Sequence, residues 1–438
     1  MHRIIAAAWF LALSLAPLLA QEKPPAPAPT AEAAAIDKLI EQLGDRNFRA
    51  REAAAKALDE RGESSLPALR RALSTSTSPE VRSRLQTIVT AMERKCALQP
   101  KRVTLTCKNM PVNDVVSALS KQTGYSIQHN GNRGVNLTFD LQNVTFWEAL
   151  DRICLDTGLT PQQNDGAVLQ LYQQELLWPH TCYQGPFKVM ANSFQYNKSI
   201  SLGGLQRNPL HNQSRSETLN FSFSILSEPK LPIMQIGQAK LIEALDENGV
   251  SMKMPNANMH ESQYYNGGGY RTHNQSGFIN LLWPNKEVRT VKRIKASLPV
   301  TVLAFQKPEI EVAEITKVKN KKFTGNGTEI QIDDVKELNN KTSYHIKMGV
   351  RNLSPNANQD YTWSQSVYQR IELYDAKGNK YFSQGQNWES GSPANVQATF
   401  MFGTNGDASI GPPVRLVFNH WGMLQHQVDF EFRDLPLP

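Results

Sequence analysis

The pattern of apolar and polar residues between positions 102 and 172 describes one small unit that occurs twice. Each copy has an alternating stretch typical of a strand, then an apolar stripe at helical spacing, then a short closing strand. Gly124 and Gly158 stand where each helix would need a C-terminal cap. The apolar positions are Val103, Leu105, Cys107, Val112, Val115, Val116 and Leu119 in the first copy, and Val135, Leu137, Phe139, Phe146, Leu150, Ile153 and Cys154 in the second.

Neither copy can bury its helix stripe and its sheet face alone. Two copies side by side would make one sheet covered by two helices, a closed two-layer α+β domain. Such a domain is small and rigid and leaves no cavity for a reactant. We therefore expect residues 102–172 to bind other molecules and to perform no chemistry.

These residues resemble the short N-terminal domain of secretins and TonB-dependent receptors. That resemblance implies a periplasmic module that recognises other envelope proteins. Neither a membrane barrel nor a secretin pore domain follows it here, so gated transport is not implied. The matching residues are Leu105, Lys108, Asn109, Met110, Pro111, Asp114, Val115, Val116, Leu119, Thr123 and Gly124, then Leu137, Leu141, Val144, Glu148, Ala149, Leu150, Ile153, Thr157, Gly158 and Leu159.

Residues 35–95 have helical periodicity throughout and predict four short antiparallel helices. Asp45 is placed to cap the second helix, Phe48 to lie on its apolar side, and Gly62 to end it. The order of Leu-Gly-Asp, Arg-Glu-Ala, Leu-Pro-Ala-Leu and Pro-Glu-Val-Arg resembles a HEAT-type repeat. Solenoids of this kind need several repeats to bury their faces, so this segment should dock on a neighbouring domain or a partner; a simple spacer is the alternative.

From residue 176 onward the pattern is that of strands. Two hairpins turn at 246–249 and 375–378, and each is followed by a closing strand, "LPVTVLAF" and "HQVDFEF". The matching order predicts two β-sandwiches with an Ig-like plan, at 176–307 and 308–438, divided near Lys307 and Pro308.

The first residues have the features of export. Residues 1–20 read as a secretory signal peptide, with a basic start, an apolar run and a small residue for cleavage. Residues 21–34 alternate proline and alanine as an extended linker. No later stretch is long and apolar enough to be a membrane span.

The charge and the cysteines fit that compartment. The formal net charge is +7 and the isoelectric point about 9.1, which in an exported protein points to anionic envelope polymers or lipid headgroups and away from nucleic acid. Four cysteines in an oxidising compartment suggest disulfides, with Cys107 and Cys154 as the preferred pair. The alternative is that both are small buried apolar residues.

The sequence contains none of the local motifs of common enzymes, so we expect no catalytic residue, no metal site and no cofactor. His180 with Cys182, and His260 with Glu261 and His273, are the nearest candidates, and each set reads better as structural or solvated residues. A hydrolase would need carboxylates that converge in a cleft, which sequence alone cannot show.

A tyrosine-rich loop is the most suggestive surface. Tyr264, Tyr265, Tyr270 and Arg271 surround a run of glycines, and aromatic residues and arginine are enriched at interfaces and sugar-facing surfaces. We take them as candidate binding residues. The basic stretches at 286–295 and 318–322 fit solvated edge strands or contact with an anionic polymer.

The whole chain is thus predicted to be a multidomain α+β protein: a helical repeat segment, a two-layer domain and two sandwiches. The expected function is a non-enzymatic exported scaffold that contacts envelope proteins, one route being strand addition at a sheet edge. The alternative is a carbohydrate-binding or carbohydrate-active envelope protein that uses the tyrosine loop, Trp283 and Trp363.

Overall fold

The structure is a computed structural model that describes residues 31–437 apart from 132–133, 164–167, 175–177, 201–214, 255–269, 284–286, 340, 356 and 360. The chain divides into two compact units, Met1–Met92 and Glu93–Pro438. The predicted signal peptide lies outside the described residues. Among the helices that are described, none has the length and apolar character needed to cross a bilayer.

The first unit is helical, as predicted. Leu58, Leu69 and Leu85, from three different helices, are completely buried. Gly62 ends the second helix with a φ of 62°, and Pro67 lies in the first turn of the third. The helices are α1 (Ala31–Gln42), α2 (Phe48–Arg61), α3 (Leu66–Thr75) and α4 (Pro79–Leu98).

Three details of this unit differ from the sequence prediction. Helix α1 starts at Ala31, inside the predicted linker. The cap of α2 is Asn47, whose side chain accepts the N–H of Arg49 at 2.9 Å, while Asp45 accepts the N–H of Asn47. Phe48 is 62% exposed because it is the first residue of α2, ahead of the buried positions Ala54 and Leu58.

The doubled unit of residues 102–172 has the predicted elements. Both helices end at a glycine in the left-handed conformation, Gly124 with a φ of 75° and Gly158 with a φ of 70°. Thr145 and Glu148 form a capping box at the start of the second helix. The elements are β1 (Arg102–Pro111), α5 (Val112–Thr123), β2 (Ser126–His129), β3 (Asn136–Thr145), α6 (Phe146–Thr157), β4 (Leu159–Gln163) and β5 (Val168–Gln173).

These strands form two sheets, where one was predicted. β1 pairs antiparallel with β3, whereas β2 pairs parallel with β5, which in turn pairs with β4. The predicted core is confirmed, since Val115, Leu119, Leu150 and Ile153 are all fully buried in one cluster. The same cluster contains Met190 and Leu226 of the next domain, so the two domains share a core.

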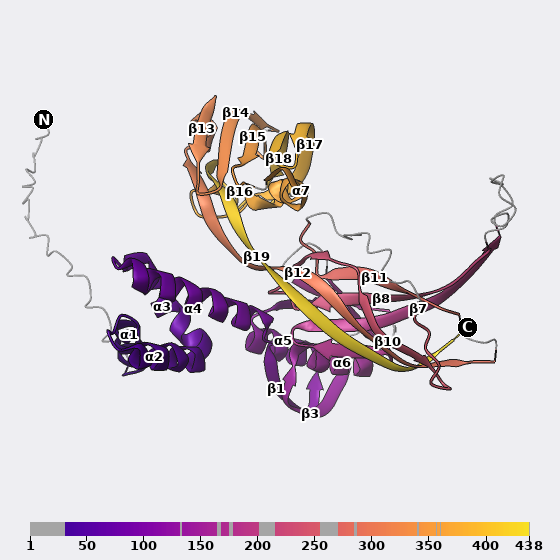
Figure 1. The fold of residues 1–438 in the computed structure, drawn as a ribbon. Coiled ribbons are helices and arrows are strands. Elements are labelled where there is room, and N and C mark those ends of the chain that lie inside the picture. Colours follow the sequence, from indigo (N-terminus) through magenta and orange to yellow (C-terminus); the bar gives the residue numbers. More distant parts are fainter. Residues whose placement is uncertain are drawn as a thin grey trace, which may run out of the picture. The chain divides into compact units, whose positions relative to one another are not determined.

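In the first sandwich, a four-stranded sheet packs against strands β9, β10, β12 and β19 (Figure 1). The order of the four strands is β11, β8, β7, β6. Its core includes Phe187, Phe221, Phe223 and Phe430. The strands are β6 (Thr181–Gln184), β7 (Phe187–Ile200), β8 (Arg215–Ser227), β9 (Ile233–Ile236), β10 (Lys240–Asp246), β11 (Asn274–Leu281), β12 (Thr290–Ala313) and β19 (Pro413–Pro436).

In the second sandwich, a five-stranded sheet packs against β16, the C-terminal end of β12 and the N-terminal end of β19. The order of the five strands is β13, β14, β15, β18, β17. Tyr344, Phe400 and Phe418 are buried in its core. Its elements are β13 (Lys321–Thr324), β14 (Thr328–Leu338), β15 (Ser343–Asn352), α7 (Tyr361–Arg370), β16 (Ile371–Asp375), β17 (Phe382–Ser392) and β18 (Asn395–Gly403).

The two sandwiches share a ribbon, which corrects the predicted division near Lys307 and Pro308. β12 and β19 are 24 residues each, pair antiparallel from Thr290 to Ala313, and contribute side chains to both cores. The stretch "HQVDFEF", predicted to close the second sandwich, belongs to β19 and completes the first, because Val428 pairs with Leu298. Each strand of the ribbon therefore serves two domains.

Both predicted hairpin turns are confirmed and have one design. Asp246 and Asp375 are each buried at the start of the turn, and one carboxylate oxygen accepts the N–H groups two and four residues on. Gly249 and Gly378 follow with φ values of 78° and 85°. Side-chain acceptance of these N–H groups is what aspartate supplies in turns.

Candidate functional site

The structure places half of the predicted tyrosine site. Tyr264 and Tyr265 lie outside the described residues. Tyr270 is 46% exposed, and its ring centroid lies 5.6 Å from that of Tyr368 in α7. Two exposed or half-buried tyrosines from different parts of the sequence thus meet at the join between the sandwiches.

Arg271 is built into a cation–π cluster at this join. Its backbone N–H donates to Gln369 Oε1 at 2.8 Å. Its guanidinium carbon lies 5.3 Å from the ring centroid of Trp421, and that of Arg370 lies 4.7 Å from the same ring. Trp421 is only 4% exposed, so these contacts are largely desolvated and hold the loop, α7 and β19 together.

A buried carboxylate lies beside this cluster. Glu372 accepts hydrogen bonds from Lys380 at 2.6 Å, Tyr374 at 2.8 Å and Asn419 at 2.9 Å. Burial alone would raise the pKa of Glu372, but the hydrogen bond and charge of Lys380, with Asn419 and Tyr374, outweigh burial and lower it. The carboxylate is therefore held ionised as a structural anchor.

A second cluster binds the segment between α4 and β1. It is formed by Glu228 and Lys230, and we call it the linker clamp. Both carboxylate oxygens of Glu228 accept the N–H of Lys101, at 3.0 and 3.2 Å, and one accepts the Tyr125 hydroxyl at 2.6 Å. Lys230 Nζ donates to the carbonyl oxygens of Cys96 at 3.3 Å and Gln99 at 2.6 Å. The lysine thereby caps the C-terminal end of α4.

Burial dominates the ionisation of the clamp. Glu228 has no exposed surface, and desolvation raises its pKa to about 7, although the Tyr125 hydroxyl, Lys230 and the Lys101 N–H each act to lower it. The pKa of Tyr125 rises in turn because it is buried and faces Glu228. Glu228 is therefore a carboxyl group that changes charge near neutral pH inside a domain junction.

A third cluster joins α6 to the first sandwich. Lys188 is 3% exposed, and its Nζ lies 2.5 Å from Asp151 Oδ1, while the Tyr183 hydroxyl donates to Asp151 Oδ2 at 2.6 Å. Trp147 Nε1 donates to the carbonyl oxygen of Pro186 at 3.1 Å. Polar groups that are buried at a junction require such defined partners.

The predicted disulfide is wrong in this structure. Cys107 and Cys154 are both free thiols, as are Cys96 and Cys182. Both side chains belong to the core of the doubled unit, Cys107 from β1 and Cys154 from α6, where the charges of Asp151 and Lys188 also act on the Cys154 thiol. Burial raises the pKa of Cys107, and raises that of Cys154 to about 12, so both act as small apolar residues.

The other residues that were considered as catalytic or metal-binding candidates make structural contacts where the structure describes them. His273 is 6% exposed, and its Nε2 lies 3.1 Å from the carbonyl oxygen of Pro229, inside the linker clamp. Burial raises the pKa of Cys182. His260 and Glu261 fall outside the described ranges, and within those ranges no group of three metal-binding side chains occurs.

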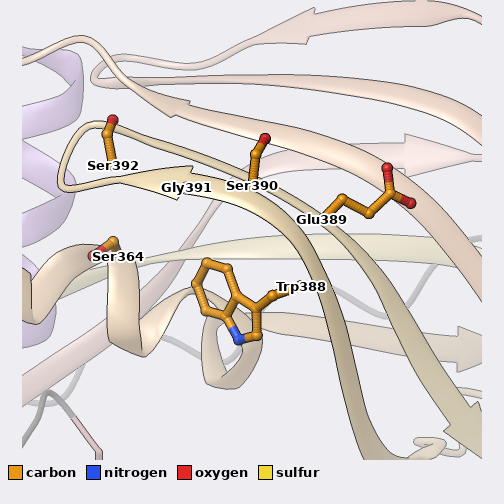
Figure 2. Close-up of a pocket in the computed structure, with 6 residues that line it drawn as sticks. All are labelled: Ser364, Trp388, Glu389, Ser390, Gly391 and Ser392. Carbon is orange, nitrogen blue, oxygen red and sulfur yellow. The ribbon is translucent and has the colours of Figure 1, made fainter.

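An open pocket of about 290 Å³ lies between α7 and the end of β17. Trp388, 47% exposed, forms its apolar wall, and Figure 2 shows the ring on the same side of the strand as Ser364, while Glu389 points away. A Cβ on Gly391 would meet the Trp388 ring at 3.1 Å, so the glycine lets the ring lie close to the strand. Its volume lies just below the range of about 300 to 1,000 Å³ that is typical of small-molecule sites.

The basic stretches are more neutral than their sequence suggests. Val288 and Ile294 are buried as predicted, but β12 is an inner strand, between β10 and β19, and not an edge. Arg293 contacts Glu243 at 2.6 Å, and Lys295 pairs across the ladder with Glu431. Two of the cations that were candidates for an anionic polymer, Arg293 and Lys295, thus have acidic neighbours.

Sequence reasoning missed Glu228, Lys230, Lys188 and Trp421. The partners of Glu228 and Lys230 lie more than a hundred residues away, and Asp151 lies in another domain than Lys188. Trp421 contacts Arg271 and Arg370, which come from other elements of the chain. The one usable signal was a charged triplet, Glu228-Pro-Lys230, directly after the apolar strand β8.

Comparisons with known proteins cover only part of the chain. No curated protein matches it. A conserved domain protein from Bacillus anthracis is 11% identical over 57% of this chain and 89% of its own, with a TM-score of 0.15. A chain of the Salmonella type III secretion injectisome basal body, built from InvG, PrgH and PrgK, is 8% identical over 74% of this chain and 92% of its own, also with a TM-score of 0.15.

A TM-score of 0.15 supports no statement about fold or function from either structure. The match that does carry weight is the family of HEAT repeats over residues 20–88, which agrees with the helices of the first unit. The amino-terminal segment is therefore similar to HEAT repeats.

Proposed function

We propose that this chain is an exported, non-enzymatic scaffold of the bacterial cell envelope that binds other proteins. The observation that carries the proposal is the exposed edge of β17 with Trp388 beside an open pocket. HEAT repeats use their surfaces for binding, and the exposed Phe48 with Arg51 5.7 Å from its ring centroid offers a further contact there.

β17 has the properties of a strand-accepting edge. It is eleven residues long, pairs with β18 alone among the described strands, and is exposed along almost its whole length. Its sequence contains no lysine and no proline. The opposite edge, β13, is four residues long and begins with Lys321 and Lys322, which is how proteins discourage pairing.

An extended partner segment fits this edge better than a second copy of β17 does. Register shifts at 383–385 and 388–390 interrupt β17, so two identical edges would not match over their length. A short partner strand could pair with the regular stretch between the shifts and place one apolar side chain against Trp388.

The junctions support a scaffold that holds its surfaces in a fixed arrangement. The linker clamp, the Lys188 and Asp151 pair, and the stacked arginines on Trp421 each join parts of the second unit through desolvated polar contacts. We keep the short N-terminal domain of secretins and TonB-dependent receptors as the proposed relative of residues 102–172, and an Ig-like plan for the sandwiches.

Site-specific photo-crosslinking of the full chain tests this proposal. A photoreactive phenylalanine at position 390, on the pocket rim, should form an adduct with an envelope protein in the source cells. The same adduct should weaken at least tenfold when Trp388 is replaced by alanine. Position 322 on the lysine-bearing edge is the matched control and should give no such adduct.

The proposal fails if position 390 forms no protein adduct, or if Trp388→Ala leaves the adduct unchanged in a chain with normal thermal unfolding. An equal adduct from position 322 would also contradict it, because contact would then be unrelated to the free edge.

The alternative of a carbohydrate-binding tyrosine loop receives less support. Trp363 is 6% exposed and belongs to the core of the second sandwich. Trp283 is packed against the first core and stacks with Tyr196 at 4.3 Å. Of the described aromatic residues named for that alternative, Tyr270 is exposed, Trp283 is half-buried and Trp363 is buried.

A further inference from the structure

The outer face of β7, β8 and β11 is uncharged over a wide area, although 20% of the chain is charged. The register places its residues in rows across three adjacent strands. The open rows consist of Ser193, Ser222 and Phe278; Gln195, Asn220 and Asn280; and Asn197 and Thr218. The next row, Met190, Ser224 and Ser276, closes the face at the doubled unit, because Met190 and Ser224 are buried there.

The alternation of side chains separates this face from the core. Leu219, Phe221 and Phe223 of β8, which alternate with the residues of the face, are buried in the first sandwich. The charged pair Lys198 and Glu217 follows the same inward alternation. The one charged outer position of β7, Lys188, is covered by α6 and paired with Asp151, so the open part of this face, from Ser193 onward, is uncharged.

The face is regular and hydrogen-bonded within itself. β11 pairs with β8 over all eight of its residues without a register shift. Ser193 and Ser222 hydroxyls lie 2.8 Å apart, and those of Ser224 and Ser276 lie 3.2 Å apart. Three strands span roughly 10 Å and the positions 193 to 199 roughly 20 Å, from ordinary strand spacing and rise.

One aromatic ring stands on this polar surface. Phe278 is 53% exposed, and its neighbours across and along the sheet are Ser222, Asn280 and Ser276. Burying a ring of this size would stabilise a complex, so Phe278 is the apolar contact that this face offers a ligand.

The composition selects the chemistry of the ligand. Hydroxyl and amide side chains both donate and accept hydrogen bonds, which complements the hydroxyl groups of a sugar. An anionic polymer would call for lysine and arginine, which this face lacks. Protein interfaces are enriched in tyrosine, tryptophan and arginine and depleted in serine, the reverse of this face.

We infer that the outer face of β7, β8 and β11 binds an extended, neutral polysaccharide chain, with one sugar ring on Phe278 and flanking hydroxyl groups on Asn220 and Asn280. This site goes beyond the proposed protein-binding function, because it lies in the other sandwich from β17. It is also separate from the predicted tyrosine site around Tyr270.

Affinity electrophoresis of the full chain tests this site. Glycol chitin, a neutral soluble polysaccharide, should retard the protein in the gel, and Phe278→Ala should weaken the apparent affinity at least tenfold. Asn280→Ala should weaken it by a smaller factor, and Phe278→Trp should restore retardation. Because Phe278 and Asn280 are both exposed, these variants keep the core intact.

Phe305→Ala is the matched control, since it removes another partly exposed phenylalanine outside the face. It should leave retardation unchanged. The inference is overturned if glycol chitin does not retard the wild-type chain, if Phe278→Ala is retarded as strongly as the wild type, or if polygalacturonate, an anionic polymer, retards the chain more strongly than glycol chitin does. Any of these results leaves protein binding at β17 unaffected.

Discussion

The carboxyl group of Glu228 accepts the backbone N–H of Lys101 through both of its oxygens, at 3.0 and 3.2 Å, although 127 residues separate them. Two residues further on, Lys230 binds the carbonyl groups at the end of α4. One short loop after β8 thus holds the segment between α4 and β1 at two points. Lys230 binds carbonyl groups at the end of α4, and Glu228 binds the N–H of Lys101, just before β1.

The clamp should weaken as pH rises. The pKa of Glu228 is about 7 in the folded chain and about 4.5 in an unfolded one, so folded Glu228 binds its proton more tightly. The stability that this gives is complete below about pH 4.5 and is lost by about pH 7, a change on the order of 3 kcal/mol. Hydrogen exchange of the Lys101 amide, corrected for intrinsic rates, should report it.

Glu228→Gln removes this titration and should make the opening free energy at Lys101 nearly constant between pH 5 and pH 8. Glu311→Gln, at a carboxyl that is 49% exposed, should retain the wild-type pH dependence. A wild-type clamp that opens equally at pH 5 and pH 8 would show that burial does not control Glu228.

Removing Asp151 should destabilise the fold more than removing its ion-pair partner Lys188 does. Asp151→Ala leaves a buried ammonium group without its partner and should cost about 3 kcal/mol, whereas Lys188→Met leaves a partly exposed carboxylate that still binds Tyr183 and should cost less. The double variant should recover most of the loss. Urea unfolding of the four chains measures this, and additive effects would mean that the two groups do not interact.

The contact of Arg271 with Trp421 should contribute about 1 kcal/mol. A double-mutant cycle with Arg271→Met and Trp421→Leu isolates that coupling from the loss of packing. Lys307, which lies 5.9 Å from the Phe305 ring centroid, gives a matched exposed pair through Lys307→Met and Phe305→Leu. Its coupling should be smaller, because Phe305 is 37% exposed and Trp421 only 4%.

The turn at Asp375 should become less stable in acid, because protonation weakens the hydrogen bonds that the Asp375 carboxylate accepts. The N–H of Gly411, then Asn379 and the N–H of Lys377, lower the pKa of Asp375 to about 2 from an ordinary value of 3.8. Its contribution is therefore present above about pH 4 and lost as pH falls towards 2. Asp375→Asn should lower the apparent melting temperature at pH 7 and have little effect at pH 2; an equal effect at both would exclude the ionised carboxylate as the cause.

Local features of the fold were readable from sequence because their causes are local. Glycine at 124 and 158 ends each helix of the doubled unit, and aspartate at 246 and 375 starts each turn. Alternation and helical spacing placed Val115 and Leu150 in the core. In each case the deciding contacts lie within about ten residues or follow from one element's periodicity.

Long-range pairing was not readable. An alternating stretch such as 426–432 fits any open sheet, so sequence could not show that Val428 pairs with Leu298 in the first sandwich. The same limit explains why the predicted single sheet is two sheets, since β2 pairs with β5 and not with β1. Two inward cysteines also carry no information about the distance between them: Cys107 and Cys154 lie in the same core, and both are free thiols.

Hydrogen exchange of the full chain, free and bound to envelope protein from the source cells, tests the binding scaffold most directly. If β17 accepts a partner strand, its amides, from Phe382 to Ser392, exchange more slowly in the complex, and those of β13 do not change. Unchanged exchange along β17 in a chain that has bound its partner would contradict this proposal.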